Sequence, residues 1–284
     1  MSKISRRGLR ITAAVAGAGV IAAAAWATTA HGGPAHAATS SVPGGAITDT
    51  RVHLTPMPQG TVTYSRDGNG HVDVTVSAFG LTPGSSHAVL LMNGRGAVAA
   101  FRPLTANSLG QARGETLDSS YTRTLGSLAV AILKGNGSAP ATRLAIARTG
   151  TYDGGQRTYQ LIPVETGEDG RNWGTPQGSA VIAYDRTART ISVTVNATGF
   201  APGAHAAHIH VGSCVSQGRV EYMLADYTAN AKGQIVNQIR VATNVTAAPP
   251  ATGWYFNLHE GNRGNILFNG SPTINFRPLL CGDI

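Results

Sequence analysis

The chain has 284 residues, of which 13% are charged, and its formal net charge is +8. Four basic residues and no acid lie in the first ten positions, so residues 38–284 keep 18 basic and 14 acidic residues, a net charge of +4. The rest of the chain has no run rich in Lys and Arg, which excludes nucleic-acid binding through a basic patch. Abundant Gly, Thr, Ala and Val favour short strands and turns over helices.

Residues 1–37 are predicted to be an export signal. A basic start is followed by an Ala-rich apolar stretch and by the small-residue exit Ala35-His36-Ala37. The letters SRRGLR resemble a twin-arginine signal with Arg6 and Arg7 as the pair, a route that carries folded proteins. The alternative is that the apolar stretch is retained as a membrane anchor. We expect a secreted protein whose mature form has no membrane span.

Two stretches of the chain repeat each other at a spacing of about 120 residues, the size of one β-sandwich domain. Residues 58–94 begin PQGTVTYS and contain GLTPG, and residues 176–212 begin PQGSAVIA and contain GFAPG. Alternating apolar and polar residues in HVDVTVS and TISVTVN predict a half-buried strand in each copy. We therefore predict an all-β protein with tandem β-sandwiches over residues 46–150 and 157–284.

Histidines cluster in the second copy, in the letters GAHAAHIHVG. On a strand, residues i and i+2 point to the same face, so His208 and His210 should project together while Ile209 faces the core. His259, in NLHEG, ends a later apolar strand and is the expected third ligand. His205 lies in the preceding turn, and its direction depends on the local geometry.

Three imidazoles with an open position suit an exchangeable copper or zinc ion. Glu221 is expected to orient one of these imidazoles from outside the site. The alternative is a strand that merely carries two solvated histidines. Shared coordination predicts that the three imidazoles converge within about 4 Å of one another.

The first copy is predicted to be a sandwich without this site. With the Pro-Gly turns aligned, Val89 stands opposite His208 and Leu91 opposite His210, and SLAVAILKGNG contains no histidine to match His259. Aliphatic side chains therefore suffice for packing at these positions, which favours a chemical role for the histidines. Three other histidines are predicted to be solvated surface residues: His53, His71 and His87.

The chain has two cysteines, Cys214 and Cys281. In an exported protein they pair by default, and the alternative is two free thiols. A bridge would close a loop of about 66 residues and stabilise the fold by about 4 kcal/mol on the chain-entropy model.

The segments GFAPGAHAAHIHVGSC, GWYFNLHEG and RPLLCGDI resemble a CHRD (chordin-type) domain and, more distantly, copper–zinc superoxide dismutase. The resemblance covers most of residues 157–284. It implies a Greek-key sandwich of the immunoglobulin-like or superoxide-dismutase-like kind. It also implies His208, His210 and His259 as copper ligands, and Cys214–Cys281 as a disulfide.

The sequence also departs from the dismutase pattern. Val220 stands where the enzyme has the histidine that bridges copper and zinc, and the zinc-ligand loop has no counterpart. The place of the anion-guiding arginine is taken by Pro278, with Arg277 one residue away, so Arg277 is expected to act only from outside the ligand set. Zinc and efficient dismutation are therefore not expected.

Two functions remain open. The first is an exported copper-binding protein with a three-histidine site and weak superoxide dismutase activity; whether it is an enzyme is left open. The second is a non-enzymatic extracellular CHRD-type binding or adhesion module, whose partner would be an extracellular protein or glycan.

Overall fold

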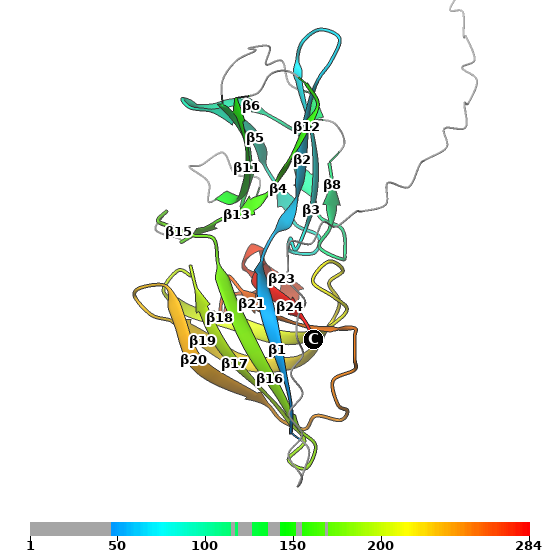
Figure 1. The fold of residues 1–284 in the computed structure, drawn as a ribbon, viewed down its shortest axis with the longest axis vertical. Helices are drawn as coiled ribbons and strands as arrows, with labels where there is room; N and C mark the ends of the chain where they lie inside the picture. The colour runs from blue at the N-terminus through cyan, green and yellow to red at the C-terminus, as the bar shows by residue number, and fades with distance from the viewer. Residues whose placement is uncertain (1–46, 115–116, 119–126, 136–142, 152–154, 168–169) are drawn as a thin grey trace, which may run out of the picture. The chain divides into compact units, whose positions relative to one another are not determined.

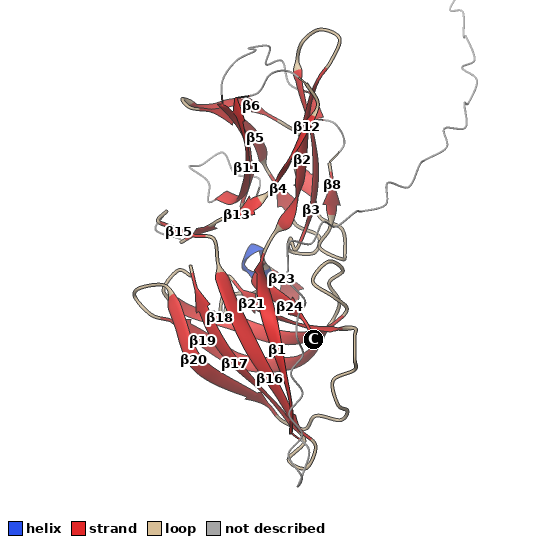
Figure 2. Cartoon of the chain, viewed as in Figure 1, coloured by secondary structure: helices blue, strands red, loops and turns tan. Residues whose placement is uncertain are grey.

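The computed structural model describes residues 47–114, 117–118, 127–135, 143–151, 155–167 and 170–284. The predicted export signal, residues 1–37, lies outside these residues. The described chain consists of antiparallel strands, turns and one short 3-10 helix, which confirms the all-β class (Figures 1 and 2). Within the described ranges, no helix has the length and apolar character needed to cross a bilayer.

The first sandwich packs two sheets around one core. One sheet has the order β12-β2-β3-β8, with β9 also paired to β3, and the other has the order β13-β11-β10-β5-β6. Val74 and Val76 of β3 face Leu91 and Val130 of the second sheet's strands in the same buried cluster. Its strands are β2 (Gln59–Arg66), β3 (Val72–Phe79), β4 (Ser86–His87), β5 (Val89–Asn93), β6 (Gly96–Ala100), β7 (Leu104–Thr105), β8 (Ala112–Arg113), β9 (Leu117–Asp118), β10 (Ser127–Leu133), β11 (Arg143–Thr151), β12 (Arg157–Gln160) and β13 (Ile162–Pro163).

The second predicted sandwich, here called the second sandwich, consists of one strongly curved sheet. Its eight strands have the order β19-β18-β21-β24-β1-β16-β17-β20. Its strands are β1 (Ile47–Pro56), β16 (Gln177–Asp185), β17 (Thr190–Thr198), β18 (Gly203–Val211), β19 (Val220–Ala229), β20 (Gln234–Ala242), β21 (Trp254–His259) and β24 (Pro278–Asp283). Two short hairpins and a 3-10 helix complete it: β14 (Glu165–Thr166) with β15 (Asn172–Gly174), β22 (Leu267–Phe268) with β23 (Ser271–Pro272), and η1 (Ile274–Phe276).

This sheet curls until its edge strands β19 and β20 meet, so that it forms a nearly closed barrel around one core. Side chains of β20 bond the backbone of β19: Gln238 accepts from the N–H of Thr228, 2.9 Å away, and Arg240 Nε donates to the carbonyl of Asp226 at 2.7 Å. Inside, the hydroxyl of the fully buried Tyr227 donates to the carbonyl of Val193 at 2.7 Å. The two halves of the sheet therefore bury a common interior.

Strand pairing differs from the predicted domain boundaries at both ends. Strand β1, placed by the sequence in the first copy, pairs with β16 and β24 of the second sandwich. Strand β12 begins at the predicted start of the second domain, yet it pairs with β2 of the first sandwich. Both differences arise because a ladder partner far away in sequence outweighs the local repeat pattern.

The sequence repeat is matched by equivalent hydrogen bonds. The amide of Asn107 caps its own turn by accepting from the N–H of Gln111 at 3.0 Å, and Asn230 accepts from Gln234 at 3.1 Å. The N–H of each asparagine also donates to the carbonyl of the same glutamine, at 2.8 and 2.9 Å. The two TAN-x-x-GQ turns are thus one structure used twice.

Candidate metal centre

The three predicted ligands come together from two neighbouring strands. His208 and His210 lie on β18, and His259 is the last residue of the adjacent strand β21. Ile209 between the first two belongs to the barrel core, so both histidines project from the opposite, outer face of the sheet. The period-two reading of this stretch is therefore confirmed.

The imidazoles of His208 and His259 are in direct contact, with His208 Nδ1 3.0 Å from His259 Nε2. One nitrogen from each of the three histidines can be chosen so that all lie within 4.8 Å of one another. The closest pair meets the expected limit of about 4 Å, and the full set is slightly wider. Because two metal–nitrogen bonds of about 2.0–2.1 Å span at most about 4.2 Å, one ring must move slightly to share an ion.

Backbone carbonyls fix the orientation of two rings. His259 Nδ1 donates to the carbonyl of Phe276 at 2.6 Å, and His210 Nδ1 donates to the carbonyl of Gly218 at 3.0 Å. Each bond places the ring proton on Nδ1 and leaves Nε2 with a free lone pair. His208 Nδ1 then donates to His259 Nε2. A metal ion bound between these two nitrogens would take the place of the shared proton.

Burial keeps the trio neutral. The three residues are 2%, 1% and 0% exposed. Burial lowers the pKa of His208 to about 3, helped by the charge of His210, and lowers that of His210 to about 4 against the opposing effect of the Gly218 carbonyl. Burial lowers the pKa of His259 well below its ordinary value as well. Neutral imidazole is the form that binds a metal.

Two aromatic rings cover the trio. Phe276 of η1 lies 4.5 Å from the His259 ring and 6.1 and 6.3 Å from those of His208 and His210, measured between centroids. Tyr255 stacks on His210 at 4.8 Å with an angle of 17° between the planes. Neither aromatic residue was identified from the sequence as part of the site, because only strand pairing and the fold of η1 bring them there.

Two buried ring nitrogens, His208 Nε2 and His210 Nε2, have no hydrogen-bond partner among the described residues. Leaving a buried polar atom unpaired costs about 1–3 kcal/mol. The chemistry of the donor set, three neutral imidazoles with an available lone pair on His210, therefore fits a borderline metal ion such as copper or zinc.

The disulfide expected from the cysteine pair is present. Cys214 and Cys281 are bonded, and their sequence separation is 67. Cys214 lies three residues after the end of β18 and Cys281 lies in β24, so the bridge ties the segment that follows the histidine strand to the strand on the far side of β21. The N–H of Cys214 also donates to Asp283 at 2.8 Å.

The two residues predicted to support the ligands have other partners. Glu221 forms an ion pair with Arg219 at 3.0 Å, and carbonyls orient the imidazoles in its place. Arg277 is completely buried and bonds Glu165 at 2.7 Å and Glu260 at 3.0 Å. A guanidinium held by two carboxylates is not available to guide an anion.

His205 is not a free ligand. Its Nδ1 faces the carbonyl of His259 at 3.1 Å and its Nε2 faces that of Ala201 at 2.8 Å. His87 has the same place in the first sandwich: its Nδ1 donates to the carbonyl of Leu133 at 2.9 Å, and Ser85 Oγ lies 2.6 Å from its Nε2. The prediction of a solvated His87 is wrong, because this residue is 0% exposed.

This equivalence corrects the alignment of the two copies by one residue. The N–H of Ala88 donates to Gly135 and that of Ala206 donates to Gly261, at 2.9 and 2.7 Å. Counting from these bonds, Leu90, Met92 and Leu133 occupy the places of the three ligands, whereas Val89 and Leu91 match the core positions of β18. The first sandwich thus has an aliphatic counterpart of the trio.

No curated protein matches the chain significantly. A family comparison does find a match that begins with β12 and extends past β21, so that it contains His205, which lies in β18, and all three histidines of the trio. Residues 156–265 match the CHRD domain model, and the chain therefore carries a CHRD domain in its second half.

Proposed function

We propose that the protein is exported and binds one copper ion at His208, His210 and His259. The observation that carries this proposal is the convergence of three buried, neutral imidazoles, two of them aimed by backbone carbonyls. Copper suits a site made only of imidazoles, and Cu²⁺ has the highest affinity among the divalent first-row metal ions for such ligands. The export signal and the disulfide agree with an oxidising compartment.

Redox activity at this site would be slow. Copper cycles between two oxidation states, but a superoxide anion would have to pass Phe276, which contacts all three rings. With Arg277 held by two carboxylates, superoxide also lacks a guiding cation, in line with the departure of this sequence from the dismutase pattern at Pro278. We therefore propose weak dismutase activity at most, with zinc disfavoured.

The covering of the three imidazoles by Phe276 also favours a second candidate function, a non-enzymatic extracellular binding module. The CHRD match over residues 156–265 supports it, because it defines a domain type and not a reaction. In that case the trio would bind a metal for stability or would stay metal-free.

The test is a copper titration of the exported chain, residues 38–284, under anaerobic and aerobic conditions. We expect stoichiometric binding, with nitrogen hyperfine splitting in the Cu(II) electron paramagnetic resonance spectrum. Each of His208→Ala, His210→Ala and His259→Ala should abolish this signal, while His53→Ala, at an exposed position, should leave it intact. Circular dichroism of each variant separates loss of ligand from loss of fold.

Weak binding that is equal in wild type and in the three ligand variants would contradict the copper proposal and leave the binding module. Stoichiometric copper without measurable superoxide consumption would support metal binding and exclude the dismutase activity.

A further inference from the structure

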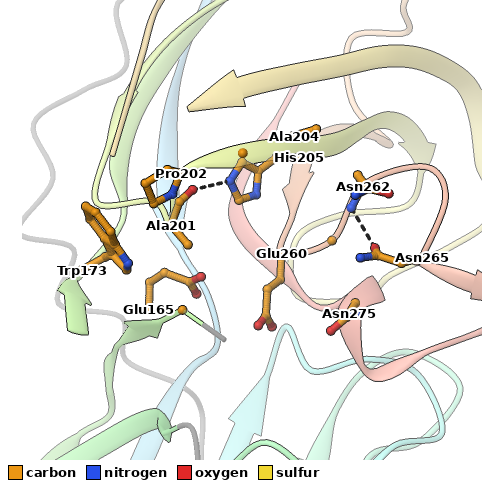
Figure 3. A pocket seen from close by; sticks show the side chains of 13 residues that line it. Glu165, Trp173, Ala201, Pro202, Ala204, His205, Glu260, Asn262, Asn265 and Asn275 are labelled. Carbon is orange, nitrogen blue, oxygen red and sulfur yellow. Dashed lines mark hydrogen bonds between the residues drawn. The ribbon is translucent and has the colours of Figure 1, made fainter. Parts of the chain in front are cut away.

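The second sandwich contains a polar cavity of about 340 Å³ that none of the metal ligands lines (Figure 3). Its wall is formed by the β14–β15 hairpin, by the turn leading into β18 and by the segment that follows β21. The volume lies in the range of about 300–1,000 Å³ that is typical of small-molecule sites. The cavity is therefore large enough for one small ligand.

Two carboxylates line this cavity, and both are already balanced by cations. Arg277 bonds Glu165 Oε2 at 2.7 Å and Glu260 Oε2 at 3.0 Å, and Lys134 bonds Glu260 Oε1 at 2.7 Å. The four side chains together carry no net charge when all are ionised. A cationic ligand would thus find no unpaired charge, and an anionic ligand would face two carboxylates.

One carboxylate oxygen is left for a ligand. Three of the four oxygens bond Arg277 or Lys134, and no donor among the described residues reaches the fourth, Glu165 Oε1. The side chain of Glu165 is 1% exposed, and Figure 3 shows its carboxylate on the side that faces Glu260. Oε1 is not among the fully covered polar atoms that lack a partner, so this oxygen opens on to the cavity, where a ligand hydroxyl can donate to it.

The remaining lining groups are mainly donors. Asn262 and Asn265 use their side-chain oxygens within the protein, accepting from Gly264 and from the N–H of Asn262, each at 2.8 Å. Asn275 accepts from Lys134 at 2.7 Å in the same way. Their NH₂ groups therefore remain as donors.

A further donor comes from an indole. Trp173 Nε1 is buried without a partner among the described residues, and Figure 3 shows it on the side of the ring that faces Glu165. The guanidinium of Arg171 lies 4.1 Å from the ring centroid and helps to hold the indole in place.

We propose that this cavity binds a neutral sugar residue. A hydroxyl group both donates and accepts, so a ligand rich in hydroxyls can donate to Glu165 Oε1 and accept from Trp173 Nε1 and the asparagine amides. The charge balance excludes ions of either sign as the preferred ligand. The proposal is independent of copper, since its residues are not metal ligands.

The experiment is saturation-transfer NMR and calorimetry on the exported chain, with glucose, galactose, mannose and N-acetylglucosamine as probes. Glucosamine and glucuronate serve as the cationic and anionic comparators. We expect at least one neutral sugar to bind more tightly than both charged sugars. Glu165→Gln and Trp173→Phe should each weaken that binding about tenfold, as the loss of one hydrogen bond predicts.

Asn69→Ala is the matched control, because Asn69 is exposed in a turn of the first sandwich. It should leave sugar binding unchanged, as should chelation of copper. Tighter binding of glucosamine or glucuronate, no binding of any neutral sugar, or equal binding by wild type and both cavity variants would each overturn the proposal. Trp173→Phe keeps an aromatic ring in place, which guards against a variant that fails to fold.

Discussion

His208 Nδ1 and His259 Nε2 lie 3.0 Å apart although 51 positions separate the two residues. Their contact depends on the ladder between β18 and β21, in which His208 stands opposite Asn257 and His259 extends one step beyond Leu258. The hydrogen bond of His259 to the carbonyl of Phe276 then decides which nitrogen faces His208. The centre is thus defined by main-chain geometry.

Removing the phenyl ring of Phe276, which covers the trio, should speed metal exchange. Phe276 packs on His259 at 4.5 Å, so Phe276→Ala opens a path to the lone pairs while the carbonyl at position 276 still orients His259. We expect the copper association rate to rise at least tenfold and the fold to lose about 3–5 kcal/mol. Stopped-flow binding checks the rate, with Phe268→Ala, at an exposed ring, as the control. An unchanged rate would show that Phe276 does not limit access.

The metal-free protein should lose stability on acidification. The pKa of His208 is lowered to about 3 and that of His210 to about 4, from about 6.5 in an unfolded chain. Full stability is therefore present above about pH 6.5, and it falls between there and about pH 4, because only the unfolded chain takes up protons in this window. Urea unfolding at a series of pH values measures the slope.

The first sandwich supplies the matched control for this pH effect. The triple variant His208→Leu, His210→Met and His259→Leu places the side chains of Leu90, Met92 and Leu133 in the second sandwich. It should be less sensitive to pH in the same window and more stable at neutral pH, since buried unpaired nitrogens are removed. An equal slope in both proteins would assign the acid sensitivity to other groups.

Breaking the buried ion network should be costly. Burial raises the pKa of Glu165, and the positive charge of Arg277 opposes this effect. The ionised form of Glu165 is therefore stabilised mainly by Arg277. Arg277→Met leaves Glu165 and Glu260 without it and should cost about 3–5 kcal/mol of unfolding free energy. Arg219→Ala removes an arginine that is 72% exposed from its pair with Glu221 and should cost at most about 1 kcal/mol. Equal losses would contradict this ranking.

Removing the disulfide should loosen both the fold and the metal centre. With a sequence separation of 67 between the cysteines, the chain-entropy model gives a loss of about 4 kcal/mol for Cys214→Ala with Cys281→Ala. Since Cys214 lies shortly after the histidine strand β18, which ends at Val211, we also expect weaker copper binding. Thermal unfolding and copper titration with and without a reductant check the two effects. A variant with wild-type affinity would mean that the ladder alone holds the ligands.

Period-two alternation was enough to predict the all-β class and to place His208 and His210 on one face. The third histidine of the trio, His259, and the disulfide followed from residue type and from the resemblance. Glu165 could not be predicted as a partner of Arg277, because no local pattern links a short hairpin to a residue at the end of η1 more than a hundred positions away. The burial of His87 could not be predicted for a related reason: the burial of a polar side chain depends on which segments of the chain lie over it.

The one-residue error in aligning the copies came from the same source. The first copy has one residue more between its Pro-Gly turn and the strand, and only the bonds of Ala88 and Ala206 show where the extra residue is absorbed. An alignment that starts from the Pro-Gly turns places every later residue of one copy opposite the wrong residue of the other. A shift of one residue exchanges the inward-facing and outward-facing positions of a strand.

Strand β1 makes the first sandwich an insertion within the barrel. Leu54 pairs with Gly178 across the ladder of β1 and β16, so the two ends of the inserted segment lie beside each other as in the turn of a hairpin. During synthesis, β1 emerges long before β16 and β24, and it must wait with an unpaired edge until the whole first sandwich has been made. Folding of the inserted sandwich brings those ends together and shortens the search for closure.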